Sequence, residues 1–185
     1  MPGRVTLVLG GIRSGKSAFA EELAGRSGEP VLYLATGQAF DDEMEDRIRI
    51  HRERRPASWR TLEEPLALSE SLNQYFEANS GVGVALLDSV DVWISNLMLA
   101  REEEETDATE AIALESLDST LTLCRQLLTQ VVLVSSEVGL SPVSPNHLGR
   151  QFQDLLGTVN QRAAAQADEV FLVVSGIPVK IKPPP

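Results

Sequence analysis

Residues Gly10-Gly11-Ile12-Arg13-Ser14-Gly15-Lys16-Ser17 match the pattern G-x-x-x-x-G-K-[ST] and decide the fold class. An apolar stretch over residues 4–9 precedes them, and a segment rich in Ala, Glu and Leu follows. Glycines allow a tight turn that points backbone N–H groups at phosphate oxygens, and the positive end of the next helix favours the same anion. Lys16 is expected to reach the β- and γ-phosphates, and the Ser17 hydroxyl to ligate Mg²⁺. The stretch predicts a phosphate-binding loop rather than an ordinary glycine-rich turn, and therefore a nucleotide-binding protein.

Short apolar runs alternate with helical patterns along the chain, which is typical of an α/β fold with a largely parallel sheet. The runs are almost uniformly apolar, as in strands covered on both faces. Strands are expected at residues 4–9, 31–35, 82–87, 131–135 and 170–174. Helices are expected at 16–26, 41–54, 65–79, 109–129 and 147–167, with a shorter one near Val92. Residues 101–106, with four consecutive glutamates, are expected to form a solvated loop.

The composition limits the function classes. A chain of 185 residues with 43% hydrophobic residues can bury one core, so a single domain over residues 1–185 is expected. The 27 acidic residues outnumber the 16 basic ones, which argues against a nucleic-acid or anionic-membrane surface. No apolar run approaches the roughly 18 residues of a membrane span, and no secretory signal pattern is visible, so a cytoplasmic protein is expected. The single cysteine, Cys124, excludes an intramolecular disulfide framework.

A phosphate-binding loop also needs a carboxylate at the end of a neighbouring strand to hold the magnesium ion. Asp88 and Glu137 both follow apolar runs. Asp88 fits the pattern of a hydrophobic run followed by Asp better, with a capping or surface role as the alternative. Glu137 would then activate or orient a nucleophile.

Basic residues concentrate around one histidine. Six of the 16 basic residues, namely Arg47, Arg49, Arg52, Arg54, Arg55 and Arg60, surround His51. In an acidic chain this concentration predicts an anionic partner. His51 shares a helical face with Met44 and Ile48, so a packed, hydrogen-bonded histidine is one interpretation. The other is a nucleophile that attacks phosphorus and forms a phosphoramidate, with nearby guanidinium groups stabilising the charge. The only other histidine, His147, is expected to be structural or exposed.

The ordered set of motifs resembles the bifunctional adenosylcobinamide kinase/adenosylcobinamide-phosphate guanylyltransferase family of cobalamin biosynthesis. The resemblance runs along nearly the full chain. It is carried by residues 10–17, 33–36, 41–44, 47–48, His51, 55–56, 59–61, Glu63, 86–89, Trp93, 96–97, 134–139, 157–161, 167–170, 174–177 and 179–180.

The resemblance implies two reactions. The γ-phosphoryl group of GTP or ATP passes to the aminopropanol hydroxyl of adenosylcobinamide. GMP from GTP then passes, through a covalent guanylyl-histidine at His51, to adenosylcobinamide phosphate and gives adenosyl-GDP-cobinamide. The resemblance also implies a P-loop, RecA-like α/β domain, Mg²⁺ and a homotrimer. Its nucleotide-contacting positions carry over to Gly10–Ser17, Thr36, Gly37, Gln38, Arg52, Glu53, Arg54, Arg55, Glu63 and Asp88.

This chain departs from the family pattern at a few positions. Ile50 precedes His51 where some relatives have two adjacent histidines. Residues 147–154 lack two of the basic residues expected there, which affects corrinoid or phosphate contacts rather than GTP binding. The sequence leaves two alternatives open. One is a monofunctional P-loop kinase or ATPase that acts on another small molecule, and the other is a non-catalytic nucleotide-binding regulator.

Overall fold

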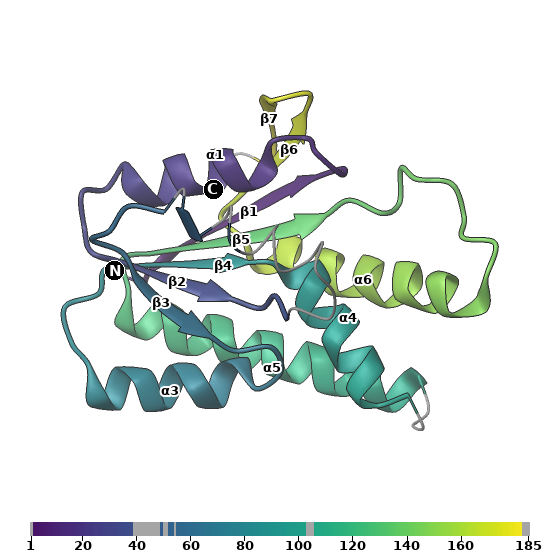
Figure 1. The fold of residues 1–185 in the computed structure, drawn as a ribbon, viewed down its shortest axis with the longest axis horizontal. Helices are drawn as coiled ribbons and strands as arrows, with labels where there is room; N and C mark the ends of the chain where they lie inside the picture. The colour runs from purple at the N-terminus through teal and green to yellow at the C-terminus, as the bar shows by residue number, and fades with distance from the viewer. Residues whose placement is uncertain (1, 39–48, 50–51, 54, 103–105, 183–185) are drawn as a thin grey trace.

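A seven-stranded sheet forms the centre of the computed structural model, which describes residues 2–38, 49, 52–53, 55–102 and 106–182 (Figure 1). The strand order is β3-β2-β4-β5-β1-β6-β7. All neighbouring pairs are parallel except β6 and β7, which are antiparallel. The strands are β1 (Arg4–Gly10), β2 (Val31–Ala35), β3 (Arg60–Glu63), β4 (Val84–Asp88), β5 (Gln130–Ser136), β6 (Glu169–Val174) and β7 (Ile177–Lys182).

Helices cover both faces of the sheet. They are α1 (Lys16–Gly25), α3 (Leu68–Ala78), α4 (Val90–Ala100), α5 (Thr106–Leu127) and α6 (His147–Gln166). Helix α1 lies above the sheet in Figure 1, and α3 and α5 lie below it. Val8 packs with Ala20 of α1, whereas Leu7 packs with Trp93 and Leu117 on the other face. Successive strand residues point to opposite faces, so uniformly apolar strands supply both cores.

Local sequence explains where the long helices form. Asn146 caps α6 because its Oδ1 accepts a hydrogen bond of 2.6 Å from the backbone N–H of Gly149. In α5, Ala113, Leu117, Leu121 and Cys124 are buried at helical spacing. This face of α5 is therefore core in the described structure.

All five expected strands are confirmed, with boundaries shifted by at most two residues. The sequence pattern missed the two edge strands. Strand β3 reads Arg-Thr-Leu-Glu with a single half-buried apolar residue, and β7 alternates exposed apolar residues with proline and lysine. Edge strands need no continuous apolar run and tolerate proline, so neither strand has the signature used for the central ones.

The connection before α5 is shorter than expected. Arg101 and Glu102 form a turn, and α5 already begins at Thr106, whereas residues 103–105 lie outside the described part. Among the described helices, none combines the length and the apolar character that a membrane crossing requires.

Candidate functional site

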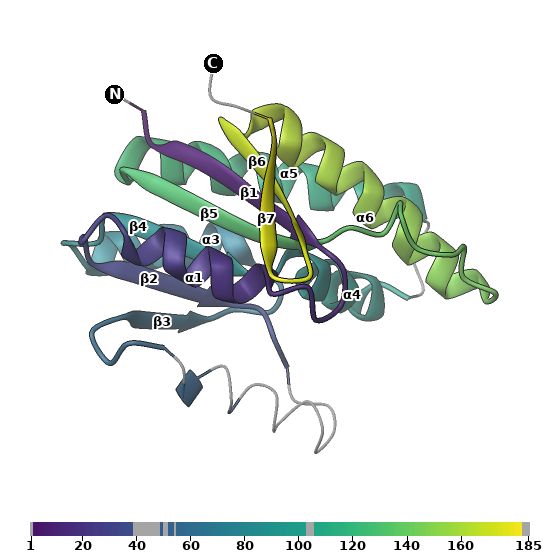
Figure 2. The ribbon, with the colours of Figure 1, turned by 90° about the horizontal axis from the view of Figure 1, so that it is seen from above.

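The loop over residues 10–17 joins β1 to α1 in the expected strand–loop–helix arrangement. Gly15 has φ +93° and stands immediately before the first residue of α1. At Gly10, a Cβ atom would lie 2.4 Å from Ser14 Oγ and 2.8 Å from the Val173 carbonyl oxygen. No side chain fits there, so this glycine is required by close approach of the backbone. The loop is held from the side by the β6–β7 turn, where Gly176 N–H donates to the Ser14 carbonyl over 2.7 Å (Figure 2).

Ser17 and Asp88 meet at the carboxyl edge of the sheet, next to Lys16 in the loop. Lys16 Nζ lies 3.5 Å from the Gly11 carbonyl oxygen, close to the loop. Ser17 Oγ donates to Asp88 Oδ1 over 3.3 Å. Asp88 ends β4, which is separated from β1 by β5 alone. The structure therefore brings together the hydroxyl and the carboxylate that the sequence predicts as magnesium ligands.

The oxygen atoms at this point fit a magnesium ion chemically. Mg²⁺ prefers oxygen ligands and usually takes one or two from the protein and the rest from phosphates and water. Ser17 and Asp88 supply a hydroxyl and a carboxylate side by side. Within the described part of the chain, no group of three or more His, Cys, Asp or Glu residues could hold a metal ion. Ser17 and Asp88 could therefore supply one or two of the oxygen ligands of a phosphate-bound magnesium ion.

Tyr33 orients Asp88. Its hydroxyl donates to Asp88 Oδ2 over 2.6 Å, and its side chain is buried in β2. Burial raises the pKa of Tyr33 strongly, and the charge and hydrogen bond of Asp88 add to the effect. The phenol therefore stays protonated and remains a donor. The Arg55 guanidinium carbon lies 3.6 Å from the centre of the Tyr33 ring, which connects the arginine-rich segment to the same residue.

Thr36 holds the chain beside Asp88. It is fully buried, and its hydroxyl donates to the Ser89 carbonyl over 2.8 Å and accepts from the Ser89 N–H over 2.9 Å. The Thr36 carbonyl accepts from Asn96 Nδ2. The expected nucleotide contacts continue past it, with Gly37 exposed and Gln38 half-buried. The Thr36 side chain itself is engaged in fixing the ends of β2 and β4.

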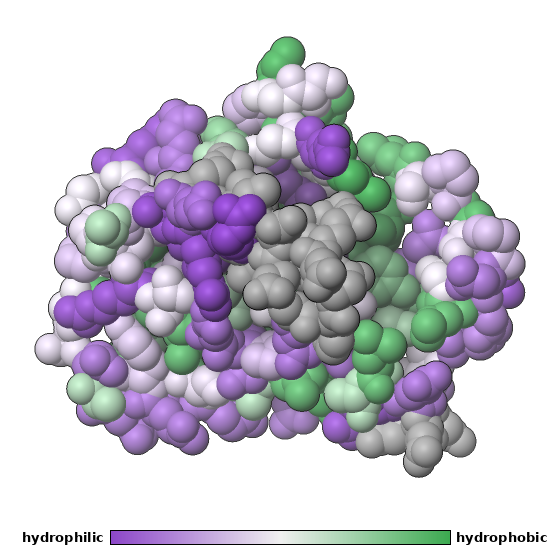
Figure 3. All heavy atoms as spheres, in the orientation of Figure 1, coloured by the Kyte–Doolittle hydropathy of each residue, from purple (hydrophilic) through white to green (hydrophobic). Residues whose placement is uncertain are grey.

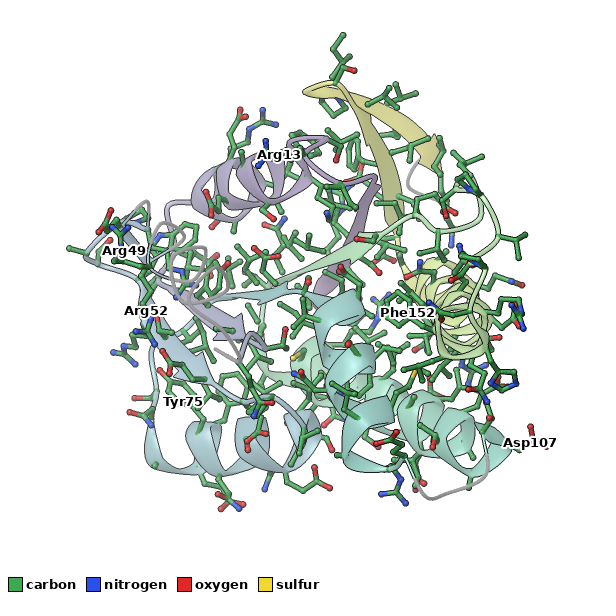
Figure 4. All side chains as sticks on the ribbon, turned by 45° about the vertical axis from the view of Figure 1, so that its right-hand side comes forward. Arg13, Arg49, Arg52, Tyr75, Asp107 and Phe152 are labelled. Atoms are coloured by element: carbon green, nitrogen blue, oxygen red, sulfur yellow. The ribbon has the colours of Figure 1, made fainter. Side chains whose placement is uncertain are left out.

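Part of the arginine-rich segment is described. Arg52 and Glu63 form an ion pair, which connects this segment to the end of β3. Arg49 donates to Glu53 over 2.9 Å, one helical turn away. Figure 4 shows Arg49 and Arg52 near each other at one edge of the molecule. His51, Arg47 and Arg54 lie outside the described residues, so their expected roles stay predictions.

Glu137 follows β5 directly, and β5 lies between the strand that leads into the phosphate-binding loop and the strand that ends in Asp88. Its backbone N–H donates to the Gly10 carbonyl over 3.2 Å, and its Oε1 accepts from the Gly139 N–H over 2.7 Å. Of the two candidate carboxylates, Asp88 accepts the hydrogen bond from Ser17. Glu137 accepts one from Gly139 instead. His147 is exposed at the start of α6, as expected.

Residues 6–181 match the family described as "Cobinamide kinase / cobinamide phosphate guanyltransferase". The chain belongs to this family. It is 42% identical over 179 residues to the "Bifunctional adenosylcobalamin biosynthesis protein CobP" of Pseudomonas aeruginosa, which covers 97% of this chain and 98% of that protein. It is 44% identical over 182 residues to the "Bifunctional adenosylcobalamin biosynthesis protein CobU" of Escherichia coli, covering 95% and 98%.

The fold has a more distant counterpart. The crystal structure of the RadB recombinase superposes with a TM-score of 0.51 at 16% identity, covering 92% of this chain and 74% of that one. This likeness concerns the fold alone and agrees with the expected RecA-like α/β arrangement. This chain thus has its loop, Lys16 and Asp88 on a mostly parallel sheet of the same fold.

Three contacts of the site had no predicted role. They are Tyr33 on Asp88, Gly176 on the loop, and Ser136, whose hydroxyl donates to Asp91 Oδ2 over 2.8 Å. A tyrosine inside an otherwise apolar strand and a Ser-Gly pair between two apolar runs were the available signals. Both signals are weak, because neither identifies the residue that is contacted.

Proposed function

We propose that this protein phosphorylates adenosylcobinamide with GTP or ATP. It then transfers GMP from GTP, through a covalent guanylyl-histidine, to adenosylcobinamide phosphate and forms adenosyl-GDP-cobinamide. The observation that carries the proposal is the match of residues 6–181 to a family named for both activities. The assembled loop, Lys16, Ser17 and Asp88 agree with it.

In the phosphorylation step, the acceptor hydroxyl oxygen attacks the γ-phosphorus, the bond to the β–γ bridging oxygen breaks, and a nucleoside diphosphate leaves. The backbone N–H groups of residues 10–17 and Lys16 hold the triphosphate and stabilise its charge. Ser17 and Asp88 would hold Mg²⁺, which neutralises charge on the β- and γ-phosphates when bound. Tyr33 keeps Asp88 facing Ser17.

In the guanylylation step, a ring nitrogen of His51 attacks the α-phosphorus of GTP and pyrophosphate leaves. A phosphate oxygen of adenosylcobinamide phosphate then attacks the same phosphorus, the P–N bond breaks, and the imidazole is released. Arg52, Arg54 and Arg55 are proposed to stabilise the phosphate charge, and Glu53, Glu63 and residues 36–38 to contact the nucleotide. Arg52 already pairs with Glu63, so a phosphate would compete with that carboxylate for the guanidinium group.

The remaining properties follow from the family resemblance and from composition. We propose a single cytoplasmic domain that assembles as a homotrimer and takes no nucleic-acid partner. The formal net charge of −11 supports the last point, because a polyanion would be repelled by most of the surface.

Labelling with GTP that is radioactive at the α-phosphate tests the proposal directly. With Mg²⁺, the protein should gain label that survives alkali and is lost in acid, as a phosphoramidate does. His51→Ala should remove the label, whereas His147→Ala, which changes the only other histidine, should keep it. Label that persists in His51→Ala would contradict the assignment of the nucleophile. Absence of label on folded, GTP-binding protein would reduce the proposal to a P-loop kinase or a regulator.

The two activities should also separate genetically. Lys16→Ala should abolish both reactions, because each needs the triphosphate to be held. His51→Ala should keep phosphorylation of adenosylcobinamide while losing guanylyl transfer. Equal loss of both activities in a folded His51→Ala protein would contradict this division.

A further inference from the structure

A cavity of about 440 Å³ lies where β1 and β5 end against helix α6. We call it the α6 cavity. The loop after β5 forms one wall, with Glu137, Val138, Ser141 and Val143, and the face of α6 that contains Gly157 forms the other. Leu9, the residue before the phosphate-binding loop, also lines it. The cavity therefore opens beside the phosphate-binding loop, on the face of the sheet opposite α1.

The walls of the α6 cavity are fixed by hydrogen bonds. Gln153 accepts from the Ser144 N–H over 2.8 Å and donates to Ser141 Oγ and to the Pro142 carbonyl. Arg150 donates to the carbonyl groups of Ser144 and Pro145. Asn160 accepts from Ser135 Oγ over 2.7 Å and donates to the Ser136 carbonyl. These bonds attach both the loop and the end of β5 to α6, so the cavity is a built feature of the fold.

Other polar groups of the cavity are not used in this way. Glu137 engages Oε1 with the Gly139 N–H. Within the described part of the chain, its other carboxylate oxygen, the Asp154 carboxylate and the Gln161 amide have no hydrogen bond to another side chain or backbone group. Two carboxylates and an amide bind N–H and O–H donors. They would repel a triphosphate, and the one guanidinium group, Arg150, is held on loop carbonyls.

We propose that the α6 cavity binds the hydroxyl-bearing arm of the acceptor, with Glu137 accepting the hydroxyl proton. The inference rests on the proposed kinase function and adds the acceptor site to it. Cobinamide carries primary carboxamides and a neutral aminopropanol arm, which supply N–H and O–H donors for the carboxylates of this cavity. A volume of about 440 Å³ is within the range of small-ligand sites, roughly 300–1,000 Å³, and suits the arm rather than the whole corrin ring.

The mouth of the cavity offers a surface for the ring. Val143 lines the cavity and is 77% exposed, and Leu140 in the same loop is 79% exposed. Figure 3 shows apolar surface on the loop between β5 and α6, at the upper right of the view. Exposed apolar side chains beside a cavity that also carries two carboxylates and an amide fit a ligand with a large apolar body and a hydrogen-bonding arm. The ring would lie on this loop while the arm enters toward the phosphate-binding loop.

In this arrangement the acceptor hydroxyl attacks the γ-phosphorus with Glu137 as the proton acceptor. The arm oxygen forms a bond to the γ-phosphorus, the bond to the β–γ bridging oxygen breaks, and the hydroxyl proton passes to Glu137. The position of Glu137 supports this role, because its backbone N–H contacts Gly10 and its strand lies between β1 and β4. The proton acceptor and the bound triphosphate would thus be adjacent.

Gly157→Leu is the sharpest test, because a Cβ atom at Gly157 meets nothing within 4 Å and the new side chain would occupy the cavity. Replacing a helical glycine also favours folding. Ala165→Leu is the matched control, since Ala165 is exposed on the same helix and does not line the cavity. Equilibrium dialysis of cobinamide, followed by its visible absorbance, should show binding weakened about tenfold or more by Gly157→Leu only. GTP binding should be unchanged in both variants.

Glu137→Gln tests the proton transfer separately. It should lower kcat for cobinamide phosphorylation by about 10²- to 10⁴-fold, while GTP binding and histidine labelling stay within twofold. Glu115→Gln, on the exposed face of α5, removes the same charge away from the cavity and should change nothing. The inference would be overturned if Gly157→Leu bound cobinamide as tightly as the wild type, or if Glu137→Gln kept the wild-type kcat. Either result would leave the proposed function intact. Failure of the wild-type protein to bind cobinamide would instead overturn the proposed function, and this inference with it.

Discussion

Removing one oxygen atom from Tyr33 isolates the interaction that orients Asp88. In Tyr33→Phe the buried ring and its packing against Arg55 remain, and only the 2.6 Å hydrogen bond to Asp88 is lost. A net hydrogen bond to a charged group contributes about 1.5–3 kcal/mol. Since Asp88 is half-buried and water can replace part of the lost bond, we expect the lower part of that range, about 1.5–2 kcal/mol.

Urea unfolding at pH 7, followed by circular dichroism, measures this loss of stability. Tyr75→Phe is the control, because the Tyr75 hydroxyl is buried without a hydrogen-bond partner among the described residues. Removing that hydroxyl should be neutral or slightly stabilising. Tyr75 belongs to α3, and Figure 4 shows it at the lower left, away from Arg13 of the phosphate-binding loop at the top.

The same variant should also affect magnesium use. Asp88 would keep its contact with Ser17 but lose the Tyr33 bond that orients its other oxygen, so the Mg²⁺ concentration for half-maximal kinase rate should rise in Tyr33→Phe and stay constant in Tyr75→Phe. If Tyr33→Phe matched the wild type in both unfolding free energy and magnesium dependence, the reasoning that Tyr33 fixes Asp88 would be wrong.

Three further predictions concern stability, reactivity and the loop. Partial burial raises the pKa of Glu64, but hydrogen bonds from Ser71, Leu66 and Ala67 outweigh this effect, so the net pKa is lowered. Glu64→Gln should therefore be less stable than the wild type at pH 7. This difference between the two proteins should disappear as the pH falls through the folded-state pKa of Glu64. Urea midpoints at pH 7 and at a series of lower pH values check this, and equal midpoints of the two proteins at pH 7 would contradict it. Burial raises the pKa of Cys124 to about 12, so a thiol reagent at pH 8 should react with it only as fast as the protein opens, and fast labelling of folded protein would contradict this. Gly10→Ala should weaken GTP binding at least about tenfold, because its Cβ has no room between Ser14 and the Val173 carbonyl; wild-type affinity in folded Gly10→Ala protein would refute the steric argument.

The central sheet could be predicted because its strands carry their signal locally. Strands β2, β4 and β5 are apolar on both faces, and that property is visible in a few consecutive letters. Strand β3 is stabilised by pairing with β2 and contributes little to the core, so its own residues do not reveal it. The same holds for β7, in which exposed apolar residues alternate with a proline and two lysines.

The site was predictable where chemistry constrains residue type and not where folding sets contacts. Lys16, Ser17 and Asp88 follow a pattern that phosphate and magnesium chemistry impose, and the structure places Ser17 against Asp88. The bond from Tyr33 to Asp88 spans 55 positions, and the contact of Arg55 with Tyr33 depends on the path of a connecting segment. No local pattern encodes such pairs, because each side chain alone is compatible with many partners.

The order of strands explains how one triphosphate site could serve two different attacks. The arginine-rich segment is attached at β3 and β2, through Arg52 on Glu63 and Arg55 on Tyr33. The α6 cavity lies beyond β4, at β5 and β1. Displacement at the γ-phosphorus and at the α-phosphorus each needs a nucleophile in line with a different leaving group, and therefore a different direction of approach. With Asp88 between the two regions, an acceptor in the α6 cavity and a group on the arginine-rich segment would approach the bound nucleotide from different sides of Asp88. A variant that fills the α6 cavity should consequently lose phosphorylation while keeping histidine labelling, and loss of both would mean that the two approaches overlap.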